Sequence, residues 1–339
     1  MANQVVSEIR KILKAVTVMS PTSFSFAGRV IDQSILPAHI AIPVETDNPL
    51  VRLLANYLYF YCFCHKFNGD LPDDRPGAPP DNDFIELLSE ANASRERWDT
   101  GWQIVQILPS GQVTAQKNGV SRSFWAGEFI TLDGPGMPLR VGATIRVFSP
   151  KESRTLQPGF YMVFSEAMID DANDYNLVRF YWNIEAEGAP ELTRQVTRSL
   201  NRFLLPFRFK CLTTPDSYTR LDSAVLYVSK RYYRITTELL ADVHRNVRQR
   251  LLPDTPIFAR RLARGLGLAE DPGDKDSFGT HRSRILAEGI VRAHDHGATT
   301  EQARLQEVVK QFHSYGIDIE RPYLNPGSQN VYTFPNTQA

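Results

Sequence analysis

Residues 206–228, PFRFKCLTTPDSYTRLDSAVLYV, decide the fold class of this 339-residue chain. The segment begins and ends with short apolar runs, 206–212 and 221–228, and a turn rich in Thr, Pro, Asp and Ser lies between them. Apolar runs of this length, separated by turn residues, predict two strands. LVRFYWNI (177–184) predicts a further strand, and GAPELTRQVTRSLNRFLL (188–205) has apolar residues at helical spacing. Strands that alternate with helices in this way indicate an α+β domain.

The same pattern continues toward the C-terminus. Residues 232–252, 277–297 and 299–316 have the apolar spacing of helices, and residues 256–273 are expected to be extended and to end in a turn. We therefore expect one α+β domain over residues 170–339.

The residues before this domain divide into two parts. Residues 2–18, 47–69 and 83–92 each predict a helix, so residues 1–95 are expected to form a helical region. Between residues 96 and 168, alternating apolar residues are interrupted by Pro-Ser-Gly and Lys-Asn-Gly turns, which is typical of successive hairpins. We expect residues 96–168 to be a small β-rich subdomain that serves as a clamp for a peptide or a partner.

The composition is that of a globular protein, with 42% hydrophobic and 22% charged residues. Lys+Arg and Asp+Glu both number 38, and this balance argues against a general nucleic-acid binder. The strongest apolar stretch, residues 50–67, contains Arg52, Asn56, His65 and Lys66, so it predicts a buried helix, because a membrane span needs ~20 mostly apolar residues. No apolar core of signal-peptide length follows the basic N-terminal residues. We expect a cytoplasmic protein that binds neither nucleic acid nor a membrane.

Two motifs that could bind a metal have simpler explanations. Cys62 and Cys64 form a C-x-C pair within an apolar run, without a second ligand pair at zinc-finger spacing, so we expect buried structural thiols. His294 and His296 are two residues apart and do not share a helix face. The phosphate-loop, dinucleotide, serine-elbow and H-E-x-x-H fingerprints are missing from the sequence. We therefore expect no metal site.

Several polar residues lie within or beside the apolar strands of the C-terminal domain. Arg179, Tyr181 and Asn183 alternate along one strand and so share a face. The others lie at strand ends or near a helix N-terminus, where the helix dipole favours an anion. A surface charge is the simpler explanation for any one of them, but the joint pattern predicts a pocket for a phosphate-like dianion. The residues in this second group are Lys210, Arg220, Asp222, His281 and Arg282.

Four segments carry a family resemblance that covers roughly residues 175–315. RFYWNI, ELTRQVTRSLN, PFRFKCLTTPDSYTRLDSAVLYV and GLGLAEDPGDKDSFGTHRSRILAEGI resemble the HopA effector-like family. Its founding members are type III effectors of plant-pathogenic bacteria, and relatives occur in gene clusters for ribosomally made, modified peptides. The family is similar to phosphothreonine lyases and to the lyase domains of some lanthipeptide synthetases. In lanthipeptide and thioamitide pathways, a separate Ser/Thr kinase-like protein phosphorylates the precursor peptide. The lyase then eliminates phosphate to leave dehydroalanine or dehydrobutyrine.

The resemblance implies roles for the polar residues. In the phosphothreonine lyases a strand lysine is the base and a phosphate-binding arginine follows it in the chain, and Lys210 and Arg220 stand in that order. A lysine base must be neutral, which burial beside arginines is expected to favour. The histidine that serves those lyases as the acid is missing from RFYWNI, so His281, or else Tyr181, is expected to donate the proton. Arg179 and Arg282 are expected to bind phosphate with Arg220. Supporting roles fall to Asn183, Asp222 and Tyr227, and neither a metal nor an organic cofactor is required.

The sequence leaves two other functions open. The protein can be a non-catalytic module that binds a leader peptide or a phosphopeptide beside a kinase. It can also be a delivered effector that acts on host signalling proteins. Exchange of Lys210 for arginine separates binding from catalysis, because binding tolerates a charge-preserving change better than proton abstraction does.

Overall fold

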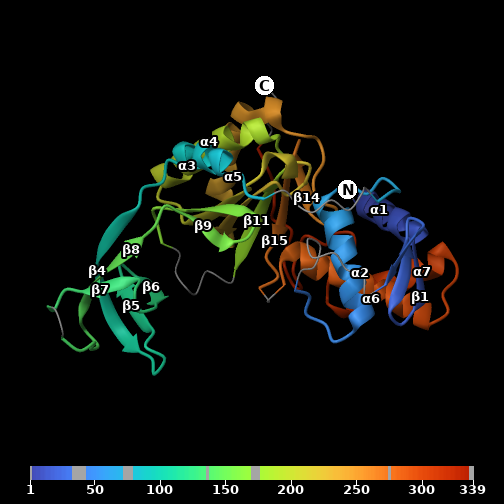
Figure 1. Cartoon of the computed structure of the whole chain (residues 1–339), viewed down its shortest axis with the longest axis horizontal. Coiled ribbons are helices and arrows are strands. Elements are labelled where there is room, and N and C mark those ends of the chain that lie inside the picture. The colour runs from blue at the N-terminus through green and yellow to red at the C-terminus, as the bar shows by residue number, and fades with distance from the viewer. Residues whose placement is uncertain are drawn as a thin grey trace.

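The computed structural model describes residues 2–32, 43–71, 79–134, 137–168, 176–273 and 276–335, without the side chains of residues 2 and 3. It is a mixed α+β protein whose strands form three antiparallel sheets of three, seven and five strands. In Figure 1 the five-stranded sheet lies at one end, the seven-stranded sheet in the middle, and the three-stranded sheet with α1, α2, α6 and α7 at the other end. No helix in the described residues is both long and apolar enough to cross a membrane.

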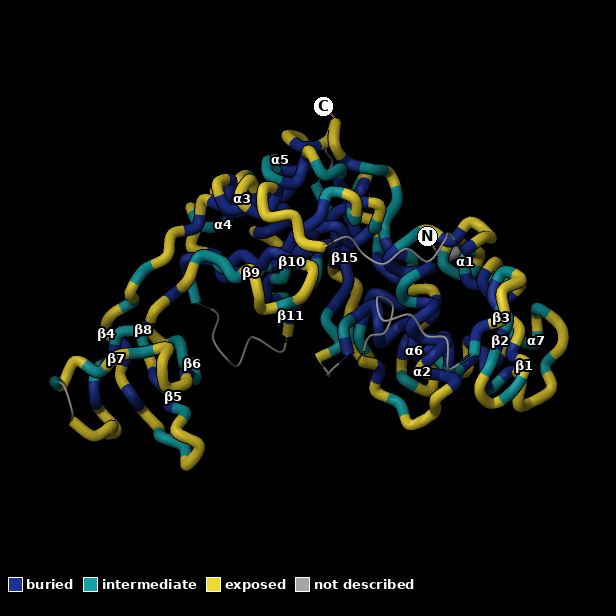
Figure 2. The backbone as a smooth tube through the Cα atoms, in the orientation of Figure 1, coloured by how far each residue is buried: buried dark blue, intermediate teal, exposed yellow. Residues whose placement is uncertain are grey.

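The seven-stranded sheet is the centre of the molecule, and its buried backbone is visible in Figure 2. Its order is β14-β15-β11-β13-β12-β10-β9, and every pairing is antiparallel. The predicted strands of the C-terminal domain are therefore confirmed, and three of them, β11, β13 and β12, lie side by side. The strands are β9 (Glu152–Gln157), β10 (Phe160–Phe164), β11 (Leu177–Trp182), β12 (Phe207–Leu212), β13 (Ala224–Ser229), β14 (Arg260–Ala263) and β15 (Leu266–Glu270).

One face of this sheet is apolar and is covered by helices. Phe180, Leu226 and Phe209 lie in register across β11, β13 and β12, and all three are buried. Helices α4 (Ala189–Arg202) and α5 (Tyr233–Val247) pack here, and the Tyr233 ring stacks on Phe180 at 6.2 Å. The short helix α3 (Asn82–Ala91) packs on α4. The opposite face carries the polar residues that the sequence singled out.

The N-terminal residues and the last two helices share one core. Helix α2 (Pro49–Leu58) continues as a π-helix, η2 (Tyr59–Cys64), and packs on α6 (Phe278–Asp295), while α1 (Ala2–Ala15) packs on α7 (Glu301–Ser314). Most elements before residue 95 thus pack against the C-terminal domain rather than forming a separate unit.

The expectation of an entirely helical N-terminal region is wrong. The helix predicted over residues 2–18 ends at Ala15, and β1 (Val16–Ser20), β2 (Ser23–Phe26) and β3 (Arg29–Asp32) form the three-stranded sheet. The reason is local. β1 reads VTVMS, which is rich in β-branched residues, and its first four side chains alternate between buried and exposed, as strand positions do.

The five-stranded sheet confirms the predicted hairpins between residues 97 and 149 and has its own core around Trp102, Ile145 and Phe124. The expected boundary at residue 168 is too late, because β9 and β10 pair within the central sheet. Four of the five residues of β10 are buried, which is typical of an interior strand with both faces covered. The five strands are β4 (Arg97–Ile107), β5 (Val113–Lys117), β6 (Val120–Phe124), β7 (Phe129–Thr131) and β8 (Thr144–Ser149).

Candidate functional site

The polar face of the central sheet brings together most of the residues predicted from the sequence. Arg179 on β11 is paired with Tyr227 on β13. Tyr181 on β11 and Lys210 on β12 are both paired with Val225 of β13, which lies between these two strands. Residues paired across antiparallel strands share a face with their Cβ atoms about 5 Å apart. The alternation of polar and apolar residues along each strand therefore gathers these side chains in one place.

Lys210 lies in the middle of this face and is only 8% exposed. Its Nζ atom is 3.9 Å from the centroid of the Phe160 ring and 5.8 Å from that of Tyr227, and it donates a hydrogen bond to Gln157 Oε1 at 3.1 Å. Phe160 and Gln157 come from β10 and β9, the strands beyond β12. The ammonium group also hydrogen-bonds to the Tyr227 side chain, so one of its three donors is left for a ligand.

Arg220 is held beside Lys210 by a carboxylate. Its Nε and Nη2 atoms donate to the two oxygens of Asp222, each at 2.9 Å, and Nη2 also donates to Cys64 Sγ at 3.1 Å. The guanidinium lies over the same Phe160 ring at 5.7 Å. Burial alone would raise the pKa of Asp222, but Arg220 outweighs it and lowers the pKa, so the pair is ionic. The Arg220 Nη1 atom has no hydrogen-bond partner in the described part of the chain.

Arg179 is held in the same way. Its Nε atom donates to Asp271 Oδ2 at 2.6 Å, and Nη2 approaches the same oxygen at 2.5 Å. The guanidinium lies 5.2 Å from the Tyr227 ring, and among the residues described here its Nη1 atom also has no partner. Burial would raise the pKa of Tyr227, but Lys210 and Arg179 together bring it below its usual value. The face thus presents three cations: Lys210, Arg179 and Arg220. In each arginine an aspartate contacts the Nε and Nη2 atoms, and the Nη1 atom on the other side of the guanidinium has no partner among the described residues.

Tyr181 completes the cluster with a polar atom that lacks a partner. The side chain is 3% exposed, and its hydroxyl makes no hydrogen bond to any described residue. Its ring packs edge-on against Phe63 of η2 at 5.8 Å and against Phe278 of α6 at 6.2 Å. Burial raises the pKa of Tyr181 well above its usual value, so the phenol stays neutral. Buried hydroxyls normally have partners, and an orphan beside three cations is suited to a bound oxyanion.

Asn183 lies on the same face but outside the cluster. Its side chain donates from Nδ2 to the carbonyl of Asp254 at 3.0 Å, and its backbone bonds with Gly265 and Leu252. These contacts hold the loop after α5 against the end of β11.

His281 and Arg282 contact the C-terminal segment, and Asn325 of that segment links Arg282 to Asp271 by accepting from Arg282 and donating to the Asp271 carbonyl. Arg282 is fully buried and donates to the carbonyls of Pro322 at 2.7 Å and Leu324 at 3.0 Å, and its Nη1 donates to His281 Nδ1. Burial, with the charges of Arg282 and Arg284, lowers the pKa of His281 to about 3. A histidine with this pKa is neutral at physiological pH, which argues against the acid role expected for His281. The described donors of Arg282 bind groups of the protein, and its phosphate-binding role stays a prediction. At the N-terminus of this helix, the Ser277 side chain accepts a hydrogen bond from the Thr280 N–H.

The sequence did not point to several residues of the site. Phe160 supports both Lys210 and Arg220, Asp271 fixes Arg179, and Tyr59 and Cys64 come from η2. Tyr59 hydrogen-bonds to Cys64, and burial raises the pKa of the Cys64 thiol to about 12, so it remains protonated. The only sequence feature that marks Tyr59 and Cys64 is the apolar segment YLYFYCFCHKF, and its thiols and aromatic rings predict buried core residues rather than a site. All three cysteines are indeed buried and free.

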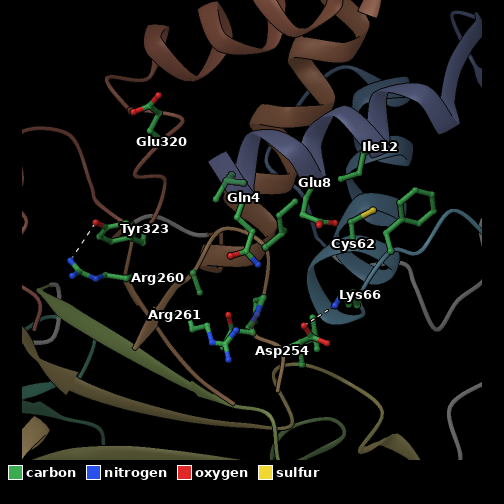
Figure 3. A pocket seen from close by; sticks show the side chains of 17 residues that line it. Gln4, Glu8, Ile12, Cys62, Lys66, Asp254, Arg260, Arg261, Glu320 and Tyr323 are labelled. Carbon is green, nitrogen blue, oxygen red and sulfur yellow. Dashed lines mark hydrogen bonds and ion pairs between the residues drawn. The ribbon is translucent and has the colours of Figure 1, made fainter. Parts of the chain in front are cut away.

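A separate pocket lies between α1, the end of η2 and β14 (Figure 3). Its lining includes three cations and three carboxylates, so it has no charge preference for phosphate, and it contains none of the predicted site residues. These charged residues are Lys66, Arg260, Arg261, Glu8, Asp254 and Glu320. Within the described chain, no group of three or more His, Cys, Asp or Glu side chains is placed to hold a metal ion.

The sequence model of the HopA1 effector protein family matches residues 151–324. The chain belongs to the HopA1 effector protein family. The matched range contains all seven strands of the central sheet and starts one residue before β9. No curated protein matches the chain.

Two solved structures of Pseudomonas syringae effector proteins are similar to this chain. The protein from pathovar tomato strain DC3000 has a TM-score of 0.48 and 15% identity, and the alignment covers 96% of this chain and 99% of the other. The protein from pathovar syringae strain 61 has a TM-score of 0.46 and 14% identity with the same coverage.

Proposed function

We propose that this protein is a phosphoserine/phosphothreonine lyase. It eliminates phosphate from a precursor peptide that a separate kinase has phosphorylated, and it leaves dehydroalanine or dehydrobutyrine in ribosomal peptide biosynthesis. The observation that carries the proposal is the position of Lys210 between two arginines, each fixed by an aspartate and each with an Nη1 atom that has no partner among the described residues. Family membership is consistent with this site because the matched range contains Lys210 and both Arg–Asp pairs.

The reaction breaks a C–H bond and a C–O bond of the substrate. In its neutral form, Lys210 removes the Cα proton, the electron pair forms the Cα=Cβ double bond, and the C–O bond releases phosphate. Arg179 and Arg220 stabilise the charge that moves onto the departing phosphate, because charge-assisted bonds strengthen as that charge develops. Their aspartates hold each guanidinium in place before the substrate arrives, so little reorganisation is needed.

The two tyrosines take different parts. Tyr227 is the better proton donor to the leaving phosphate, since Lys210 and Arg179 lower its pKa while burial raises that of Tyr181. The Tyr181 hydroxyl instead donates a hydrogen bond to a phosphate oxygen, which gives this buried group the partner that it lacks. The acid role expected for His281 passes to Tyr227 in this mechanism.

A phosphopeptide-binding module without catalysis is the second candidate. It would use the same three cations, and the aspartates behind the arginines would orient them for binding as well as for elimination. The two functions differ only in whether Lys210 removes a proton.

The test uses a synthetic phosphothreonine peptide and follows elimination by mass spectrometry. We expect Lys210→Met and Lys210→Arg to abolish elimination, while Lys210→Arg retains binding of the peptide. Lys117→Met is the control, because Lys117 belongs to the five-stranded sheet, where it pairs with Asp99. The reaction is run in EDTA, and we expect it to proceed. A Lys210→Arg protein that eliminates phosphate at the wild-type rate refutes the base role, and wild-type binding without elimination favours the binding module.

A further inference from the structure

A second pocket shares the Lys66–Asp254 ion pair with the pocket in Figure 3. Its walls come from η2 and the residues after it, the end of β11, and the loops before β13 and after α5. Two of its side chains are almost fully buried, Tyr61 at 2% exposure and Asn183 at 3%. Neither the Tyr61 hydroxyl nor Asn183 Oδ1 has a hydrogen-bond partner in the described chain. Buried polar atoms normally have partners, so these two atoms indicate a ligand.

The bonds that Asn183 and His65 already make define what their remaining atoms can do. The Asn183 side chain donates to the Asp254 carbonyl at 3.0 Å, so its nitrogen is the donor and Oδ1 is an acceptor. His65 Nδ1 lies 2.8 Å from the Phe60 carbonyl, which can only accept, so Nδ1 carries the proton. Burial lowers the pKa of His65, so the ring is neutral and Nε2 is a second acceptor. The ligand must therefore supply hydrogen-bond donors.

The charges of the lining favour a cation among such ligands. The charged residues are Lys66, Asp70 and Asp254. Lys66 Nζ is paired with Asp254 Oδ1 at 2.8 Å, and Asp70 has no ion pair with a described residue. A cation with several N–H donors matches both the acceptors and the Asp70 carboxylate. An apolar group would instead leave Asn183 Oδ1 without a donor.

The pocket adjoins the candidate site through consecutive residues. Cys64, which accepts from Arg220, precedes His65, and Arg220 precedes Leu221 of the lining. The Leu221 N–H donates to the Cys64 carbonyl at 2.7 Å, which joins the two segments. The charge of Arg220 also contributes to the lowered pKa of His65. A peptide whose phosphate is bound by Arg220 therefore has neighbouring side chains within reach of this pocket.

We propose that this pocket binds a primary ammonium group through Asn183 Oδ1, His65 Nε2 and the Tyr61 hydroxyl. An ammonium group has three N–H donors, as many as there are acceptors here. Its source is a lysine of the substrate peptide close to the phosphorylated residue, and this source alone rests on the proposed function. Phosphate and ammonium have opposite charges, so each should strengthen the binding of the other.

The experiment measures peptide binding to the full chain by fluorescence anisotropy. The probes are fluorescein-labelled phosphothreonine peptides that differ only in the residues on each side of the phosphothreonine, which are lysine, trimethyllysine or glutamine. Trimethyllysine retains the charge without N–H donors, and glutamine retains donors without the charge. The variants are Tyr61→Phe, which removes a hydroxyl without a described partner, and Asp70→Asn. The matched control is Asp47→Asn, which changes an exposed aspartate outside the lining.

We expect the wild type to bind the lysine peptide about tenfold more tightly than either of the other two. Tyr61→Phe and Asp70→Asn should each reduce this preference by about threefold or more, and Asp47→Asn should retain it. Equal binding of the three peptides by the wild type overturns the ammonium site and leaves a pocket that holds only water. A preference that survives both substitutions overturns it as well.

Elimination from the same peptides is followed by mass spectrometry, which separates this proposal from the proposed function. If no peptide is eliminated but the lysine preference depends on Tyr61, the ammonium site stands and the lyase function fails. If all three peptides are bound equally and eliminated at the same rate, the lyase function stands and the ammonium site fails.

Discussion

Removal of the Tyr181 hydroxyl tests whether the polar face is built to hold an anion. Tyr181→Phe deletes one oxygen and retains the ring that packs against Phe63 and Phe278. In the wild type, this hydroxyl is buried without a partner in the described structure. The substitution should therefore strengthen the ligand-free fold and weaken the reaction.

The magnitudes follow from the surroundings of the hydroxyl. A buried polar group without a partner costs about 1–3 kcal/mol, so its removal should raise the free energy of unfolding by at least about 1 kcal/mol. That gain corresponds to roughly 1 °C or more in Tm for a chain of this size. Loss of a hydrogen bond to a charged phosphate costs about 1.5–3 kcal/mol, so kcat/KM should fall by roughly 10- to 100-fold.

Tyr161→Phe provides the matched control, because Tyr161 is a fully buried tyrosine of the same sheet that has partners. Its hydroxyl donates to Glu152 at 2.6 Å and accepts from Asn92 at 3.2 Å. Its removal takes one hydrogen bond from each partner, although Glu152 still accepts from Ser89 and Asn92 still donates to the Lys151 carbonyl, and should lower the free energy of unfolding by about 1–2 kcal/mol. Urea unfolding of the two variants and the wild type gives the comparison, with phosphate release from one synthetic phosphopeptide measured alongside. If Tyr181→Phe destabilises the protein as much as Tyr161→Phe does, the reasoning is refuted, because the Tyr181 hydroxyl then has a partner in the free protein.

Three further predictions concern groups that the sequence linked to the site. The folded-state pKa of His281, about 3, lies below its ordinary 6.5, so stability is complete above pH 6.5 and declines as the pH falls toward 3. The wild type should therefore lose about 2 kcal/mol more unfolding free energy between pH 8 and pH 5 than His281→Gln does, measured by urea unfolding at both pH values. If both proteins lose the same amount, the low pKa of His281 is contradicted. Arg282→Met leaves the buried carbonyls of Pro322 and Leu324 without this donor, so it should lower the free energy of unfolding by about 3 kcal/mol or more. Proteolysis of the C-terminal segment should be faster, and resistance equal to that of the wild type would show that Arg282 does not hold this segment. Asp222→Asn breaks the buried pair with Arg220 and should lower the free energy of unfolding by about 3 kcal/mol, and a neutral effect in the same assay would show that the guanidinium finds another partner.

Local patterns predicted the elements better than their partners. The helix expected at 188–205 is observed at Ala189–Arg202, and the strand expected at 206–212 is observed at Phe207–Leu212, because apolar spacing depends only on neighbours in the chain. The membership of β10 in the central sheet was missed, since its pairing with β12 joins residues about fifty positions apart, and no turn signal marks such a contact.

The candidate site shows the same division. Arg179, Tyr181 and Lys210 were found because a polar side chain within an apolar strand is conspicuous in sequence. Phe160 and Cys64 were missed because an aromatic ring or a thiol in an apolar segment looks like core, and only the fold places them against Lys210 and Arg220. The helix N-terminus at Phe278 was singled out from the sequence as favourable for an anion, and the structure adds that the Ser277 side chain accepts one of its N–H donors.

The aspartates behind the arginines explain how this face can exist before a substrate binds. Three cations on one partly buried surface would repel one another, and the two carboxylates leave a net charge of about +1 as long as Lys210 carries its proton. That charge is enough to attract a phosphorylated residue, and because both carboxylates contact Nε and Nη2, the opposite donors remain available. In the proposed reaction, the same balance weakens the hold on free phosphate after the C–O bond breaks, since each arginine already has an anion. An elimination site must release phosphate at every turnover, and two pre-paired arginines meet that need better than two free ones.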